Sequence, residues 1–126
     1  MMPAMSKTSD RVNATLRAHA LSLPEAWEDH PWGESVVKVG KKVFVFFGTD
    51  ETRAAHVAVG VKLPSSADAV LSINGTERMG YGMGKSGWIW AKLAAKDVPP
   101  LELLYEWIDE SYCAVAPKRL AKLLRQ

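Results

Sequence analysis

The chain has 126 residues, 48% of them hydrophobic and 24% charged, and a formal net charge of only +2. This is ordinary globular composition, and the mild basicity permits a nucleic-acid partner without requiring one. The single cysteine, Cys113, excludes an intrachain disulfide, as is usual in a reducing cytosol.

No apolar stretch approaches the roughly 18 residues of a membrane span. The first nine residues lack the apolar centre of a secretory signal. We therefore expect a cytoplasmic protein with one domain over residues 10–126, preceded by a disordered lead-in over residues 1–9.

The first third of the chain predicts one helix and one extended segment. Ser9 or Asp10 can cap a helix that runs to about Leu21, since apolar residues recur there at helical spacing. Pro24 ends this helix. Residues 25–32 are aromatic and acidic, and they predict a short extended segment.

The next segments predict an antiparallel meander. Residues 35–39 and 43–47 are β-branched and aromatic, with a hairpin loop at Gly40 between them. Residues 48–53 are polar and indicate a turn. Residues 57–63 alternate valine or leucine with other residues, which is the strongest strand pattern in the chain.

The second half predicts one more strand and the C-terminal helices. A short helix over residues 67–71 and an irregular glycine-rich stretch over residues 79–87 precede a strand at residues 88–93. The Pro99-Pro100 pair starts a helix with a continuous apolar face, and residues 118–124 form a short basic helix.

Strands and helices are therefore segregated along the chain, not alternating. This order predicts an α+β fold, in which an N-terminal helix and C-terminal helices pack on one side of an antiparallel sheet.

Five motifs in this order resemble the MmcQ/YjbR family. They are Trp-Glu-Asp-His-Pro-Trp-Gly at residues 27–33, Val-Lys-Val-Gly-Lys-Lys-Val-Phe at 37–44, Gly-Trp-Ile-Trp at 87–90, Val-Pro-Pro-Leu at 98–101 and Glu-Ser-Tyr at 110–112. The resemblance extends over residues 10–124. It implies a fold similar to that of the CyaY/frataxin proteins and the type III secretion chaperones, in a bacterial family that is largely uncharacterised.

Members of this family are commonly described as DNA-binding, with a double-wing arrangement. The resemblance implies no catalytic residues. One departure lies before Trp88, where many relatives look like His-Met-Asn-Lys and this chain has Gly-Met-Gly-Lys-Ser at residues 82–86.

The glycine-rich stretch also matches two phosphate-binding patterns in part. Residues 82–87 fit G-x-G-x-x-G, but a strand pattern follows them where a helix is required. Gly84-Lys85-Ser86 ends like a P-loop, yet Met79 stands where the first glycine should be. We interpret the stretch as a flexible loop, and contact of its amides or Lys85 with a phosphate stays open.

Neither a metal site nor a cofactor site is indicated. The histidines His19, His30 and His56 fall on separate predicted elements without ligand spacing. Residues 28–30 could hold a cation, although a solvated acidic stretch is the commoner outcome. Cys113 follows an apolar helix face, which is typical of a structural thiol. We expect a non-catalytic domain.

Basic residues at predicted turns and loops suggest contacts with phosphates. If the tips project together, they can bind DNA without reading its sequence. The alternative is a solvated surface that protects strand edges from pairing. The residues in question are Lys41, Lys42, Arg53, Arg78 and Lys85.

Aromatic residues suggest a second kind of site. Trp88 and Trp90 share one strand face, as core residues or as an exposed platform for single-stranded nucleic acid. A protein-interaction module of the chaperone kind and a small-ligand binder or enzyme stay open as alternatives, and we expect a monomer or weak homodimer. The residues of the candidate cleft or platform are Trp27, His30, Trp32, Trp88 and Trp90.

Overall fold

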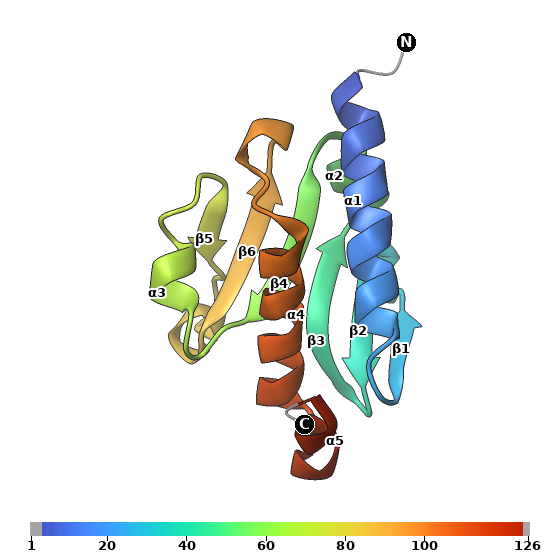
Figure 1. The fold of residues 1–126 in the computed structure, drawn as a ribbon, viewed down its shortest axis with the longest axis vertical. Coiled ribbons are helices and arrows are strands. Elements are labelled where there is room, and N and C mark those ends of the chain that lie inside the picture. Colours follow the sequence, from blue (N-terminus) through green and yellow to red (C-terminus); the bar gives the residue numbers. More distant parts are fainter. Residues whose placement is uncertain (1–3, 125–126) are drawn as a thin grey trace.

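The computed structural model describes the backbone of residues 4–124 and the side chains of residues 9–124. It contains six strands in one antiparallel sheet, in the order β1-β2-β3-β4-β6-β5, so the predicted α+β class is confirmed (Figure 1). The elements are α1 (Ala4–Leu21), β1 (Ala26–Asp29), β2 (Ser35–Val39), β3 (Lys42–Gly48), α2 (Asp50–Ala55), β4 (Val57–Lys62), α3 (Ala67–Val70), β5 (Thr76–Arg78), β6 (Trp88–Leu93), α4 (Leu101–Val115) and α5 (Lys118–Leu124). Short 3-10 helices lie at Pro31–Gly33, Met83–Ser86 and Ala95–Asp97.

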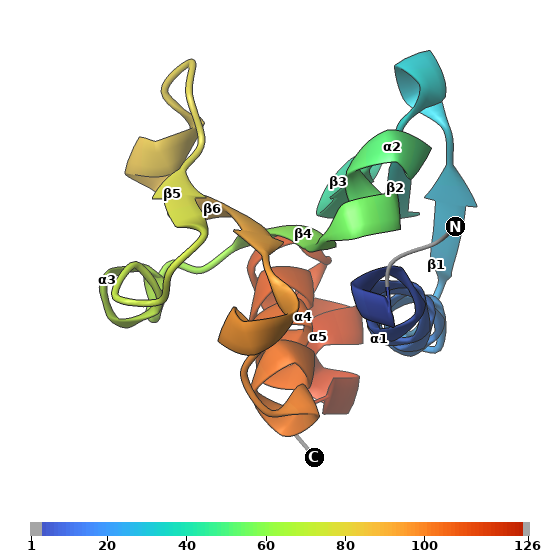
Figure 2. The same ribbon diagram turned by 90° about the horizontal axis from the view of Figure 1, so that it is seen from above.

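The long helices cover only one face of the sheet. Figure 2 shows α1, α4 and α5 together on that face. On the other side, α2 and the β1–β2 turn rise at one margin, and the β5–β6 loop rises at the other. The sheet between these two margins carries no helix. We call this surface the open face.

The core lies between the sheet and the helices. Alternate residues of β4 point into it, so Val57, Val59 and Val61 are each at most 1% exposed. The apolar stripe of α4 meets them through Leu104, Ile108 and Tyr112, which are almost fully buried. The two-residue period of β4 and the 3.6-residue period of α4 therefore place their apolar faces against each other in the core, as predicted.

The start of the first helix and the structure of residues 48–53 differ from the prediction, and β5 was not predicted. The first helix begins at Ala4 and not at Ser9 or Asp10, because no proline or glycine interrupts the chain after Ala4. Residues 1–3 of the expected lead-in lie outside the described residues. Residues 48–53 were expected to form a turn but contain the start of α2, since Thr49 caps this helix by accepting a hydrogen bond from the Thr52 amide. β5 has only three residues, two of them charged, and such a segment carries no strand signal.

One buried hydroxyl gives a test of the helix–sheet packing. The Tyr112 hydroxyl donates to the Pro24 carbonyl at 2.6 Å, and the ring packs edge-on against Phe44. Burial also raises the pKa of this phenol. We expect Tyr112→Phe to lower the free energy of unfolding by about 1 kcal/mol, since one hydrogen bond is lost and the ring stays. Urea denaturation measures it. Tyr105→Phe is the control, because no hydrogen bond of the Tyr105 hydroxyl is found among the described residues; equal effects of the two changes would contradict the assignment.

Candidate functional site

The open face is formed by the side chains of each strand that point away from the core. In β6, Ile89, Ala91 and Leu93 point into the core and are at most 1% exposed. Trp88, Trp90 and Lys92 must then point away from the helices. Both tryptophans are half-buried, so they are not core residues. They contribute to an outward-facing aromatic surface, which excludes the first of the two predicted alternatives. We call this surface the aromatic platform.

Cross-strand pairing extends this platform over the neighbouring strands. Trp90 lies opposite Gly60 of β4, which in turn lies opposite Phe46 of β3. Phe46 and Trp88 meet edge-on with their ring centroids 5.4 Å apart. A Cβ on Gly60 would come within 3.0 Å of the Trp90 ring and 2.5 Å of Met79 Cε. The glycine thus leaves the space that the indole and the methionine occupy.

Trp27 continues the same surface at the other edge of the sheet. It pairs with Lys38 of β2, whose neighbours Val37 and Val39 point into the core, so Trp27 and Lys38 face outward. The Lys38 ammonium lies 5.2 Å from the centroid of the Trp27 ring, and the indole N–H donates to the Gly40 carbonyl at 2.9 Å. The Trp27 side chain keeps 44% of its surface exposed.

A groove of about 390 Å³ crosses the open face between α2 and the β5–β6 loop. Its walls are mostly apolar, and carboxylates and a guanidinium stand at its rim. The lining residues are Phe46, Met79, Met83 and Trp90, with Glu34, Glu77 and Arg78 and the segment Gly48, Thr49 and Thr52, together with Gly80. A groove with an aromatic floor and few polar groups is the usual form of a binding site for a planar ligand.

Lysines gather at one end of the sheet. Lys42 begins β3 and Lys62 ends the antiparallel β4, so the two lie at the same end. The Leu63 amide donates to the Gly87 carbonyl at 2.8 Å, which brings the loop carrying Lys85 to that end as well. Among residues 9–124, neither Lys62 nor the exposed lysines 41, 42 and 85 form an ion pair with a carboxylate.

The two predicted arginines are placed differently. Arg53 lies in α2, and its guanidinium donates to the Phe47 and Gly48 carbonyls and to Asp50, so it anchors the helix and is only 20% exposed. Arg78 pairs with Asp68 at 2.7 Å, but both side chains are well exposed. Such a surface ion pair contributes little to stability, so the Arg78 guanidinium can readily bind another anion in place of Asp68. Three of the five predicted cations thus share one end, Arg78 lies at the groove rim and Arg53 is committed elsewhere.

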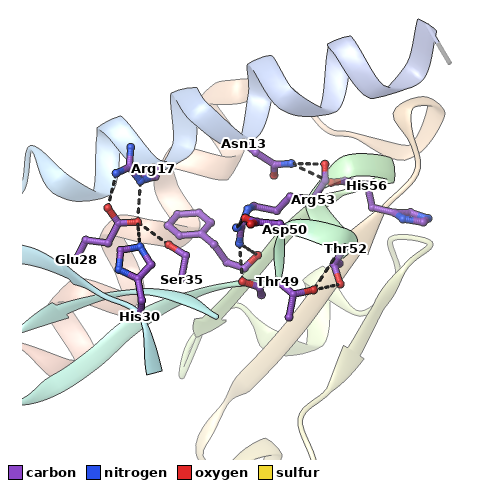
Figure 3. A network of polar contacts seen from close by, with 12 residues as sticks. Asn13, Arg17, Glu28, His30, Ser35, Thr49, Asp50, Thr52, Arg53 and His56 are labelled. Atoms are coloured by element: carbon purple, nitrogen blue, oxygen red, sulfur yellow. Dashed lines mark hydrogen bonds and ion pairs between the residues drawn. The ribbon is translucent and has the colours of Figure 1, made fainter. Parts of the chain in front are cut away.

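A second, polar cleft of about 480 Å³ lies between α1, α2 and the β1–β2 turn, and it holds His30 (Figure 3). Glu28 is its centre. The carboxylate accepts from Arg17 Nε at 2.8 Å and from Ser35 Oγ at 2.7 Å, and it lies 3.3 Å from His30 Nε2. These donors, Arg17 above all, lower the pKa of Glu28 to about 2.

The polar groups of this cleft are engaged with one another. Asn13, only 5% exposed, donates to the Arg53 and His56 carbonyls and accepts from the Ala58 amide. Together with Arg17–Glu28 and Arg53–Asp50, it ties α1 to the sheet and to α2. We interpret the cleft as a structural latch. His30 lines this cleft and Trp90 lines the groove of the open face, and the two share no lining residue, so the five predicted aromatic residues do not form one cleft.

Two fully exposed aromatic residues stand on the margins of the open face. Trp32 is 99% exposed in the 3-10 turn after β1, and Tyr81 is 107% exposed in the β5–β6 loop. Both have a left-handed backbone, with φ of 56° and 57°. Trp32 therefore neither lines a cleft nor covers the sheet edge. Tyr81 was not predicted, because its position depends on how the loop folds back from β5.

Sequence reasoning also missed most of the groove. Phe46 lies in a continuous apolar run whose alternation is hidden, since register shifts interrupt the β2–β3 pairing. Met79 and Met83 come from the irregular loop, and Glu77 comes from the unpredicted strand β5. Lys62 and Lys92 did carry a signal, because both fall on the polar side of correctly predicted strands.

Comparison with known proteins places this arrangement in a family. The YjbR family model matches residues 21–114. The chain belongs to the YjbR family. A solved structure similar to this YjbR-family chain is the Deinococcus radiodurans protein DR2400, whose domain is described as DUF419. It superposes with a TM-score of 0.67 at 22% identity, over 99% of this chain and 92% of that one. At this identity the likeness shows the shared fold. No curated protein matches the chain.

Over the described residues, no group of three or more His, Cys, Asp and Glu side chains is arranged to hold a metal ion. No helix in that part of the chain has the length and apolar character needed to cross a bilayer.

Proposed function

We propose that this YjbR-family domain is a non-catalytic binding protein that holds single-stranded nucleic acid, DNA in the first instance, on its open face. The observation that supports this most is the row of outward aromatic side chains, Trp27, Phe46, Trp88 and Trp90, on a sheet face that no long helix covers. Bases stack on such side chains irrespective of sequence, at about 1–3 kcal/mol per base.

Charge supports a polyanion as the occupant. Lys62 and Lys92 lie on the open face among the aromatic residues, and Lys41, Lys42 and Lys85 stand at one end of the sheet. Lys38 also lies on the open face, but its ammonium is paired with Asp29 at 2.7 Å. A strand that stacks its bases on the tryptophans can place its phosphates beside these ammonium groups. The described helices and the half-buried thiol Cys113 fit a cytoplasmic location.

The test is fluorescence anisotropy with a labelled single-stranded oligonucleotide and its duplex, at roughly 50 and 200 mM salt. We expect micromolar binding of the single strand, with a log–log salt slope of about −2 for three phosphate contacts. The Trp90→Leu variant should bind about tenfold more weakly, because a stacking platform is lost and an apolar side chain remains.

Matched double variants separate a site from general attraction. K62Q/K92Q removes two charges from the open face, and K96Q/K118Q removes two exposed charges from elsewhere. We expect the first to reduce the salt slope by about 1.4 and the second to leave it unchanged. Equal weakening by both, or no salt-dependent binding at micromolar protein, would exclude the proposed function.

A further inference from the structure

The groove of the open face has a carboxylate beside its main stacking surface. Glu77 of β5 is the direct antiparallel partner of Trp90, so their Cβ atoms lie about 5 Å apart on the same face. The pair lines both the groove of about 390 Å³ and an adjoining hollow of about 280 Å³. Glu77 is exposed, and within residues 9–124 its carboxylate makes neither an ion pair nor a hydrogen bond with a side chain.

We infer that Glu77 makes this site selective for a nucleobase with an exocyclic amino group, so that cytosine binds in preference to thymine. This inference rests on the proposed function and adds base selectivity to it. An ionised carboxylate only accepts hydrogen bonds. A base stacked on Trp90 can donate its amino group to Glu77, as cytosine does through N4.

Thymine presents a carbonyl oxygen, O4, where cytosine has its amino group. Two acceptors would then face one another, and Glu77 would lose its water without gaining a partner. Stacking on Trp90 alone cannot make this distinction, since both pyrimidines offer a similar ring. The edge strand β5 thus supplies the selectivity, and β6 supplies the platform.

The second carboxylate of the groove provides a matched control. Glu34 lies at the opposite rim, next to β2, and is not a cross-strand partner of an open-face tryptophan. Removing the charge of either glutamate should strengthen binding to any polyanion by a similar factor. Only Glu77 lies where its loss can change the ratio of the affinities for different bases.

The experiment measures the affinity of the whole chain for oligo(dC) and oligo(dT) of equal length by anisotropy at fixed salt. We expect the unmodified protein to prefer oligo(dC) by about tenfold. Glu77→Gln should bring this ratio close to one, because an amide can donate to O4 as well as accept from N4. Glu34→Gln should leave the ratio unchanged. Since Glu77 is exposed on an edge strand, the variant should retain the circular dichroism spectrum and melting temperature of the parent.

The possible results separate the two proposals. Equal affinity of the unmodified protein for both oligonucleotides, or a ratio that Glu77→Gln and Glu34→Gln alter alike, would overturn base selectivity and leave single-strand binding standing. Absence of binding to either oligonucleotide would overturn both.

Discussion

Ser111→Ala should lower the free energy of unfolding by roughly 3 kcal/mol, because two buried backbone groups each lose a partner. Ser111 lies on α4 and is fully buried. Its hydroxyl donates to the Phe44 carbonyl of β3 at 2.5 Å and accepts from the Lys62 amide of β4 at 2.8 Å. The paired register of β3 and β4 covers only Val45 with Val61 and Phe46 with Gly60.

In that register, Phe44 would be the next residue opposite Lys62. The two strands do not pair there, and the serine hydroxyl takes the place of a direct bond between them. Alanine would leave an N–H and a C=O without partners in a dry interior, which costs about 1–3 kcal/mol for each group. Urea denaturation measures the loss, and hydrogen exchange at the Lys62 amide reports it locally.

Ser72→Ala is the matched control. Its hydroxyl makes one exposed bond, to the Ala69 carbonyl three residues earlier, so its loss should change stability by about 0.5 kcal/mol or less. Suppose that Ser111→Ala lowered stability as little as Ser72→Ala does and that the Lys62 amide stayed protected from hydrogen exchange. This result would show that β3 and β4 had closed to pair directly. The hydroxyl would then be dispensable for the sheet.

Glu28→Gln should lower the free energy of unfolding at neutral pH by roughly 2 kcal/mol, and this loss should disappear in acid. An ordinary glutamate titrates near 4.5 and Glu28 at about 2, which corresponds to about 3 kcal/mol at full strength. We reduce this to roughly 2 kcal/mol because the partner Arg17 is 50% exposed and solvent screens the pair.

The direction of the pH dependence follows from the lowered pKa of the folded state. The stabilisation by Glu28 is fully present above about pH 4.5, where the carboxyl is ionised even in the unfolded chain. It is lost as the pH falls towards 2, since the folded protein must then take up a proton. The stability curves of the parent and of Glu28→Gln should therefore converge over this range in urea titrations at a series of pH values.

Glu25 serves as a control, because it forms the same kind of ion pair at a site that is exposed to solvent. It also pairs with an arginine through two bonds, to Arg119, and this pair lowers its pKa too. Its side chain is 57% exposed, whereas that of Glu28 is 14% exposed. Glu25→Gln should leave stability and its pH dependence within error of the parent. A pH-independent loss in Glu28→Gln would show that the bond to Ser35, and not the charge, matters.

Local sequence patterns were sufficient for most of the fold. The alternating valines of β4 and the apolar stripe of α4 each have one period, and burial of one face follows from that period alone. The helix α2 was missed because its six residues are polar or small, and only the cap at Thr49 marks it. β5 was missed because an edge strand of three residues pairs on one side only and needs no apolar pattern.

The sequence by itself determined that Trp88 and Trp90 share a strand face and that Lys41 lies at the hairpin turn and Lys85 in the segment before β6, whereas Lys42 proved to be the first residue of β3. It could not decide which face of β6 the helices cover, because the tryptophans lie on one face of this strand and other apolar residues on the opposite face. Strand order and helix packing made that choice. They place Trp90 in the groove beside its cross-strand partner Glu77, and they tie the Arg53 guanidinium to the backbone before its own helix. The decisive contacts join residues far apart along the chain, such as Ser111 and Phe44, and such contacts leave no trace in a local pattern.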